Sequence, residues 1–124
     1  MSYTEKEVKE TLKQAKKEVG LRDSLERLLK NKDFKNLFQD EYFEKEPVRI
    51  TMLRANVQLQ DPKIQAQMLN DFMAIGALDQ FFRTIMQRGQ LADKNIISCQ
   101  EYLDNPEEYQ DDEELVQWVG YKMI

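Results

Sequence analysis

The side chains that perform most enzyme chemistry are scarce in this sequence of 124 residues. It has no histidine and a single cysteine, Cys99. These absences exclude Ser–His and Cys–His nucleophile pairs, the usual zinc spacings and the Glu-x-x-His pairs of helical di-iron sites. The phosphate-binding patterns GxxxxGKS/T and GxGxxG are also missing. Magnesium chemistry with carboxylates alone stays formally open, but we expect no enzyme, no catalytic residue, no cofactor and no metal site.

Acidic residues gather near the C-terminus. The formal net charge is −5 at pH 7, and eight acids follow one another without an intervening base: Glu101, Asp104, Glu107, Glu108, Asp111, Asp112, Glu113 and Glu114. Their spacing lacks the alternation and the glycine of an EF-hand. The remainder of the chain carries +3 and is near neutral to slightly basic.

Basic residues in the first half raise the question of nucleic-acid binding. They are Lys13, Lys16, Lys17, Arg22, Arg27, Lys30, Lys32 and Lys35. Binding of phosphates needs such groups clustered on one face. Acids are interleaved among them, so the sequence disfavours direct contact with nucleic acid.

The acidic run is followed by an apolar end, LVQWVGYKMI. One interpretation is a solvated tail whose last residues fold back onto the core. Another is a docking segment in which aromatic anchors enter a partner's groove while the acids steer it to a basic surface. A third is mimicry of the charge of DNA. The candidate partner-binding residues are Leu115, Trp118, Val119, Tyr121, Met123 and Ile124, with Asp111, Asp112, Glu113 and Glu114.

Residues 61–89 carry the signals of a long central helix. Asp61 can cap its first turn, Pro62 suits the first helical position, and Gly89 suits the left-handed position that ends a helix. Apolar residues recur three and four apart, and we interpret the helix as a core element contacted on several sides. They form a first row of Ile64, Met68, Phe72, Ile75, Phe82 and Ile85 and a second row of Leu69, Met73, Ile85 and Met86. The small residues Ala74, Gly76 and Ala77 predict a close crossing by another helix.

Shorter helices are expected on either side. Thr4 and Glu7 form a capping box for a first helix that ends at Gly20, with a narrow apolar stripe of Val8, Leu12, Ala15 and Val19. A second cap is expected at Asp23 and Glu26, a break near 31–33, and then a helical row of aromatic residues. Pro47 starts a helix with Val48, Met52, Leu53 and Val57 facing inward, and 58–60 connect it to the central helix. A short linker after Gly89 precedes a last apolar segment that ends before Pro106.

These patterns predict an all-α fold: a compact bundle of about five helices around a long central helix, with an acidic C-terminal tail. We divide the chain into an N-terminal amphipathic helix (1–20), a helical core domain (21–98) and an acidic linker with an apolar docking segment (99–124). No run of 18 apolar residues exists and the N-terminus is charged, so neither a membrane span nor a secretory signal is expected. A lone cysteine is consistent with a reducing cytoplasm.

Two stretches, NKDFKNLFQDEYFEKEPVRITMLRANVQLQD and IGALDQFFRTIMQRGQLA, resemble small helical accessory and structural proteins of tailed bacteriophages. The resemblance covers about 25–93 and consists of core patterns, so it transfers no catalytic residue. It implies a virally encoded protein that acts in head structure or DNA packaging.

The sequence therefore predicts a non-enzymatic phage protein that acts by protein–protein interaction in head or portal assembly or in DNA packaging. The alternatives are an acidic inhibitor of a host nucleic-acid enzyme and a DNA-binding packaging factor. Expected partners are phage structural proteins, a host protein or further copies of the chain, with no membrane. The expected location is the host cytoplasm, and incorporation into the virion is left open.

Overall fold

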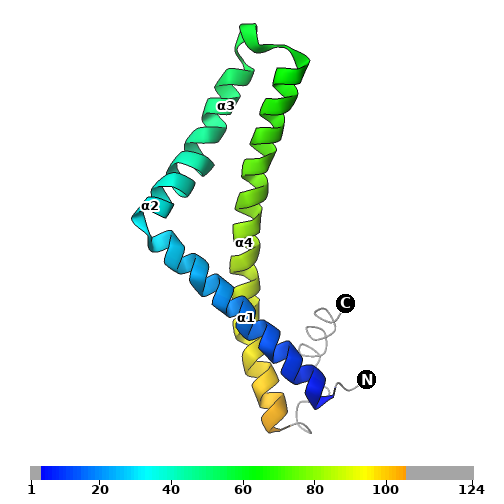
Figure 1. Ribbon diagram of the computed structural model, residues 1–124. Helices are drawn as coiled ribbons and strands as arrows, with labels where there is room; N and C mark the ends of the chain where they lie inside the picture. Colours follow the sequence, from blue (N-terminus) through cyan, green and yellow to red (C-terminus); the bar gives the residue numbers. More distant parts are fainter. Residues whose placement is uncertain (1–3, 106–124) are drawn as a thin grey trace. The chain divides into compact units, whose positions relative to one another are not determined.

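A computed structural model describes residues 4–105, and they are helical with no strand among them. The helices are α1 (Glu5–Lys30), α2 (Lys32–Phe34), the π-helix η1 (Lys35–Lys45), α3 (Glu46–Arg54), the 3₁₀ turn η2 (Val57–Leu59) and α4 (Pro62–Asp104). Since α2, η1 and α3 follow one another directly, the described residues form three long helical stretches (Figure 1). The all-α class is confirmed, whereas the predicted number of about five helices is not.

The predicted helix starts are confirmed by their hydrogen bonds. The backbone N–H of Thr4 donates to Glu7 Oε2 at 2.9 Å, and the N–H of Glu7 donates to Thr4 Oγ1 at 3.1 Å, which is the reciprocal capping box. Asp61 Oδ1 accepts from the N–H groups of Lys63 and Ile64 at 2.8 and 3.4 Å, so it caps α4. The backbone N–H groups at the start of a helix have no acceptor within the helix, and here side-chain oxygens provide acceptors for them in both helices.

The predicted helix ends at glycine are wrong. α1 continues through Gly20 to Lys30, and α4 continues through Gly89 to Asp104, so the cap at Asp23 and the linker after Gly89 are not present. No described glycine has a positive φ. A glycine inside a helix costs only about 1 kcal/mol relative to alanine, and packing of the flanking turns readily exceeds that cost.

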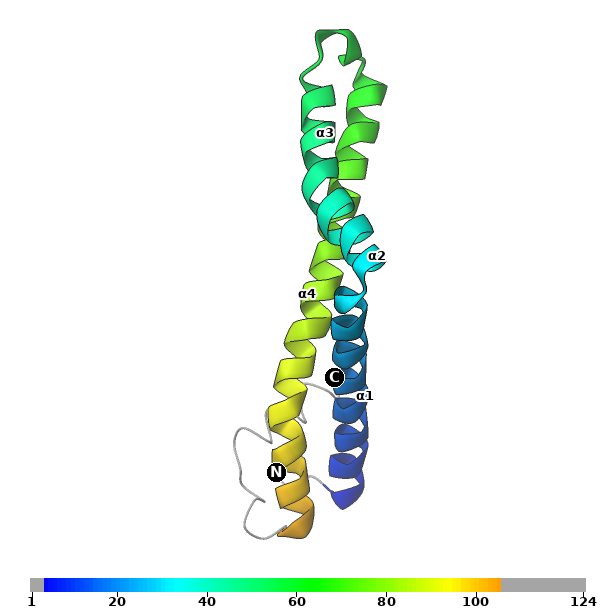
Figure 2. The ribbon, with the colours of Figure 1, turned by 90° about the vertical axis from the view of Figure 1, so that its left-hand side faces the viewer.

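Contacts divide the chain into two compact units, and both α1 and α4 contribute to each of them. The first unit contains Met1–Ser24 and Ile85–Ile124, of which 4–24 and 85–105 are described. Within it the start of α1 lies beside the end of α4 (Figures 1 and 2). The predicted stripe of α1 faces α4, where Val8 and Ala15 pack with Ala92, Cys99 and Tyr102. The stripe is confirmed as a helix-packing face.

Gly89 lies at a close approach of α1 and α4 in this unit. A Cβ at Gly89 would lie 2.4 Å from Arg22 Cβ, whereas a Cβ at Gly76 would meet nothing within 4 Å. The close crossing predicted at Gly76 is therefore wrong, and the glycine read as a helix end is the one that permits a crossing.

The second unit contains Leu25–Thr84. Here α3 and the start of α4 lie side by side, joined by the turn around η2 (Figures 1 and 2). Ile50 of α3 packs with Met68 and Ile75 of α4, and Tyr42, Phe43, Leu53 and Leu59 pack against this cluster. The turn is held by Gln65, whose Nε2 donates to Leu59 O at 2.7 Å and to Arg54 O at 3.1 Å.

The aromatic row before Pro47 also packs in the second unit. Phe34 and Phe38 stack with ring centroids 4.7 Å apart, and Phe43 meets Phe82 edge-on at 5.8 Å. A proline disfavours a helical conformation of the residue before it, yet Glu46 is helical, with φ −63° and ψ −43°. The N–H of Glu46 bonds to Glu41 O, five residues back. This π-type widening provides a way to accommodate a proline that would otherwise crowd the preceding turn.

Candidate protein-interaction surface

The pair formed by α3 and the start of α4, here called the hairpin, buries a single row from each helix. Ile50 is 2% exposed, and Met68 and Ile75 are the buried residues opposite it. A helix turns by about 100° per residue, so side chains two positions from Ile50 point to the far side of α3. This geometry decides which apolar residues form a core and which form a surface.

Two apolar side chains of α3 point away from the core. Val48 is 63% exposed and Met52 is 69% exposed, and Thr51 lies on the same side at helical spacing. The prediction that Val48 and Met52 face inward is therefore wrong, and so is the inward position of Val57, which is 86% exposed. Ile50, which is β-branched, takes the buried position because it faces Met68 and Ile75.

α4 carries an exposed row as well. Leu69, Phe72 and Met73 are 41%, 41% and 61% exposed, and Gly76 is also exposed. Positions 69, 72, 73 and 76 share one side of a helix. The interpretation of Leu69, Phe72 and Met73 as core is wrong for this structure, because the hairpin supplies one inner face and Met68 and Ile75 occupy it.

Two hollows join the exposed residues of both helices. One, of about 320 Å³, is lined by Phe43, Pro47, Phe72, Ile75, Gly76, Asp79 and Arg83. The other, of about 200 Å³, is lined by Pro47, Val48, Thr51, Met52 and Phe72. Phe72 and Pro47 border both hollows. We call the residues Val48, Thr51, Met52, Leu69, Phe72, Met73 and Gly76 the hairpin surface.

Two ion pairs lie on the helices that carry the hairpin surface. Asp79 Oδ2 accepts a hydrogen bond from Arg83 Nε at 2.8 Å, and this bond raises the pKa of the Arg83 guanidinium. On α3, Glu46 and Arg49 pair with each other, and the hydrogen bond from Arg49 lowers the pKa of the Glu46 carboxyl. Each of these two pairs matches its own charges within the chain.

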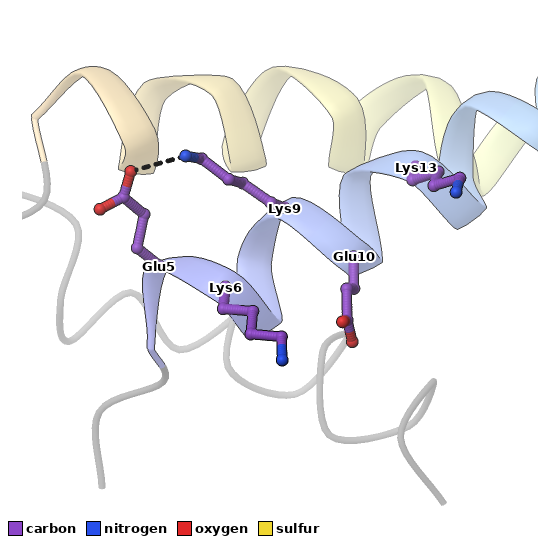
Figure 3. A pocket seen from close by; sticks show the side chains of 5 residues that line it. All are labelled: Glu5, Lys6, Lys9, Glu10 and Lys13. Atoms are coloured by element: carbon purple, nitrogen blue, oxygen red, sulfur yellow. Dashed lines mark ion pairs between the residues drawn. The ribbon is translucent and has the colours of Figure 1, made fainter.

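A larger hollow, of about 470 Å³, lies on the charged side of α1 in the first unit (Figure 3). Its lining residues are Glu5, Lys6, Lys9, Glu10 and Lys13, and all five are exposed. Figure 3 shows Glu5 and Lys9 directed toward one another, with Lys9 Nζ 3.0 Å from Glu5 Oε1. Three cations alternate here with two anions and no buried wall supports them. We regard it as a solvated helix face.

The described basic residues give little support to a nucleic-acid interface. Arg22, one of the candidates, donates to both Asp23 and Asp93, and these hydrogen bonds raise the pKa of its guanidinium. Its side chain is only 13% exposed. Arg22 therefore links α1 to α4, and it is not presented to a phosphate.

The partner-binding residues proposed from the sequence lie outside residues 4–105: Leu115, Trp118, Val119, Tyr121, Met123, Ile124, Asp111, Asp112, Glu113 and Glu114. The hairpin surface is a different candidate, whose apolar residues have the spacing of a core face in the sequence. The sequence did contain a signal for this surface. Apolar residues lie on two opposite sides of the same helix, and a single inner face cannot bury both sides.

Contact with another macromolecule is the activity that this surface can support. Its side chains offer apolar area and shape, and its one hydroxyl, Thr51 Oγ1, donates to Pro47 O at 2.8 Å. Across residues 4–105 no group of three or more cysteine, aspartate or glutamate side chains is placed to hold a metal. None of the helices described is both long and apolar enough to cross a membrane. Comparisons with models of protein families, with curated proteins and with solved structures found no match for this chain.

Proposed function

We propose that this protein acts without catalysis, by binding other proteins through the hairpin surface as part of a larger assembly. The observation that carries the proposal is the exposure of Val48, Met52, Leu69, Phe72 and Met73 on adjoining helices. Single exposed apolar residues are ordinary on protein surfaces, but a contiguous patch marks an interaction site.

The free energy available to such a contact is substantial. Large apolar side chains carry roughly 200 Å² each, so five that are about half exposed leave about 500 Å² of apolar surface in water. At about 25 cal/mol per Å², covering this surface releases about 12 kcal/mol before the costs of association. Association costs at least about 4 kcal/mol, which leaves a net free energy of at most about 8 kcal/mol, the value of micromolar binding.

We infer further that the assembly is a bacteriophage head, portal or DNA-packaging complex. This part rests on the resemblance of 25–93 to small helical proteins of tailed bacteriophages, a segment that contains the whole hairpin. A role in assembly agrees with a surface whose exposed side chains are mainly apolar. The acidic inhibitor and the DNA-binding factor gain no support from residues 4–105, and we do not propose them.

The proposal is tested by following the chain in its native source. Lysates and purified particles are fractionated by size, and the chain is detected by antibody or mass spectrometry. The wild-type protein is expected in fractions larger than its own oligomers, and Met73→Glu is expected to leave them. Ile97→Glu is the matched control, because Ile97 is 59% exposed against 61% for Met73 and lies outside the hairpin. Absence of the wild-type chain from every large fraction would contradict the proposal.

A further inference from the structure

We propose that the C-terminal segment 106–124 folds back onto its own chain, and that its apolar end, 115–124, covers one side of the pair formed by α1 and the end of α4. This contact belongs to the first unit and the hairpin surface to the second, so it goes beyond the proposed function and does not depend on it. Three observations carry it: unequal burial on the two sides of the helix pair, a buried amide without a partner, and the reach of the segment.

The two helices of the first unit meet along a line of buried residues. Val8 and Ala15 mark this line on α1, and Ala92 and Cys99 mark it on α4. A helix turns by about 100° per residue, so the positions three and four after a residue on the line fall on opposite sides of it, about 60° and about 40° away. Two helices that pack only on each other should therefore bury both sides alike, or bury the nearer position more.

Burial on the two sides is unequal at every one of these positions. The residues three after the line are between 1% and 8% exposed: Thr11, Glu18, Asn95 and Tyr102. The residues four after it are apolar and only partly buried: Leu12, Val19, Ile96 and Leu103. Because α1 and α4 run antiparallel in this unit (Figures 1 and 2), the four more deeply buried residues fall on one side of the pair, here called the covered face.

Neither the size nor the polarity of the side chains explains this difference. Tyr102 is larger than Leu103 and is nevertheless the more buried of the two, and the same holds for Glu18 against Val19. Polar side chains are mostly exposed in folded proteins, so a side that is rich in polar groups should be the wetter one. A third part of the chain must therefore lie across the covered face.

The first unit leaves little choice for this third part. Its described residues, 4–24 and 85–105, belong to the two helices and their ends, so the cover comes from the rest of the unit, 1–3 or 106–124. Residues 1–3 span at most about 10 Å, whereas Glu18 lies about 21 Å from Thr4 along α1. The segment 106–124 is the part that remains.

The segment is long enough to reach the covered face. Residues 106–114 span up to about 30 Å when extended. α4 rises by about 14 Å between Asn95 and Asp104, so the residues after 114 can lie anywhere along the covered face.

The chemistry of the covered face also selects the apolar end of this segment. Asn95 Nδ2 is buried and has no hydrogen-bond partner. A polar cover would offer it an acceptor, because buried polar groups are nearly always paired. Seven of the ten residues in 115–124 are apolar, and the acidic run precedes them. The apolar end that the sequence offered as a docking segment thus has its docking site within the same chain.

Trp118 provides a direct test, because it is the only tryptophan of the chain. Its fluorescence is measured in the full-length wild type from about 1 to about 100 µM. Emission is expected at shorter wavelength than in the urea-unfolded chain, with acrylamide quenching at least twofold weaker, and both should be independent of protein concentration. Emission and quenching equal to those of the unfolded chain would overturn the proposal.

A matched pair of labels locates the segment. Ser98 is half-buried on the side of Asn95 and Tyr102, whereas Gln100, two positions on and about 200° around the helix, is exposed. Ser98→Cys and Gln100→Cys, each combined with Cys99→Ala, are coupled to a nitroxide, which quenches tryptophan at contact. The label at 98 should lower Trp118 fluorescence at least twofold, and the label at 100 should leave it unchanged.

Two outcomes of the labelling contradict the proposal. Equal quenching from both positions would remove the segment from the covered face. Quenching that grows with the concentration of the chain would show that the cover comes from a second copy. Circular dichroism checks that the labelled variants fold, and the wild-type fluorescence decides the question without them.

Discussion

Two glycines of α4 should respond to alanine in opposite ways. At Gly89 the new Cβ would lie 2.4 Å from Arg22 Cβ, 2.7 Å from Arg22 Cδ and 2.8 Å from Arg22 Cγ. At Gly76 it would meet no atom within 4 Å. We expect Gly89→Ala to destabilise the protein relative to Gly76→Ala, although the two changes are chemically identical.

The magnitude follows from the contact at Arg22. Carbon atoms in proteins rest about 3.5–4.0 Å apart, so the gap at Gly89 must open by about 1 Å. Arg22 Cβ is fixed to the backbone of α1 and cannot rotate away, so α1 and α4 must separate locally at a cost of about 1–3 kcal/mol. Both variants gain about 1 kcal/mol of helix propensity, which cancels between them. The difference in the free energy of unfolding should therefore be about 1–3 kcal/mol.

Urea unfolding of both variants, followed by circular dichroism, provides the measurement. Gly76→Ala should unfold at higher urea than the parent and Gly89→Ala at lower urea, with equal m-values. The corresponding difference in melting temperature is about 4–20 °C for a chain of this size. Equal stability of the two variants would refute the close approach of α1 and α4 at Gly89.

Three further predictions concern buried groups and a helix start. Asn95 is 1% exposed and its Nδ2 has no hydrogen-bond partner, so Asn95→Leu should raise the free energy of unfolding by about 1 kcal/mol or more. The control Asn70→Leu, at an exposed site, should change it by less than about 0.5 kcal/mol. An Asn95→Leu variant less stable than wild type would contradict this prediction. Burial raises the pKa of the Cys99 thiol from 9.0 to about 11. Because the thiol ionises more easily in the unfolded chain, the free energy of unfolding is highest below pH 9 and falls as the pH rises through 11. Urea titrations at several pH values should thus show wild type losing about 2–3 kcal/mol more than Cys99→Ala over this interval, and parallel curves would exclude the effect. Thr4→Ala removes the acceptor for the N–H of Glu7 and should lower the free energy of unfolding by about 1 kcal/mol, with a weaker helical signal in circular dichroism. Thr4→Ser keeps an acceptor and should change neither. Equal unfolding midpoints for the two variants would argue against the capping box.

Features set by local hydrogen bonding were predictable from the sequence. The capping box at Thr4, the cap at Asp61 and the break before Lys32 depend on residues within one turn of the helix end. The apolar stripe of α1 was predictable because a single narrow row leaves no choice of face. The all-α class follows from the same signals repeated along the chain.

The role of each glycine was not predictable, because it depends on a residue far away in the sequence. Gly89 satisfies every local requirement of a helix end, yet α4 continues because Ala92 and Cys99 pack on α1. Its partner Arg22 is 67 residues earlier. Gly76 has small neighbours that suggest a crossing, but no helix of the described chain supplies one.

The orientation of α3 shows why part of the interaction surface was taken for core. Ile50 and Leu53 occupy one side of this helix, and Val48 and Met52 occupy the other. Either side alone has the spacing of a core face, so periodicity cannot rank them. The decision is made by Met68 and Ile75 of α4, which meet Ile50 once the turn at 55–61 brings the helices together.

A helix that is apolar on two sides needs two partners to bury both sides. In the hairpin, α3 and α4 each have one partner within the chain, and each still exposes apolar residues such as Met52 and Met73. The second partner must come from outside residues 25–84 of the same copy, because α3 and α4 already use their inner faces on each other. The surplus of apolar residues that misled the assignment of the core is therefore the physical reason to expect an interface.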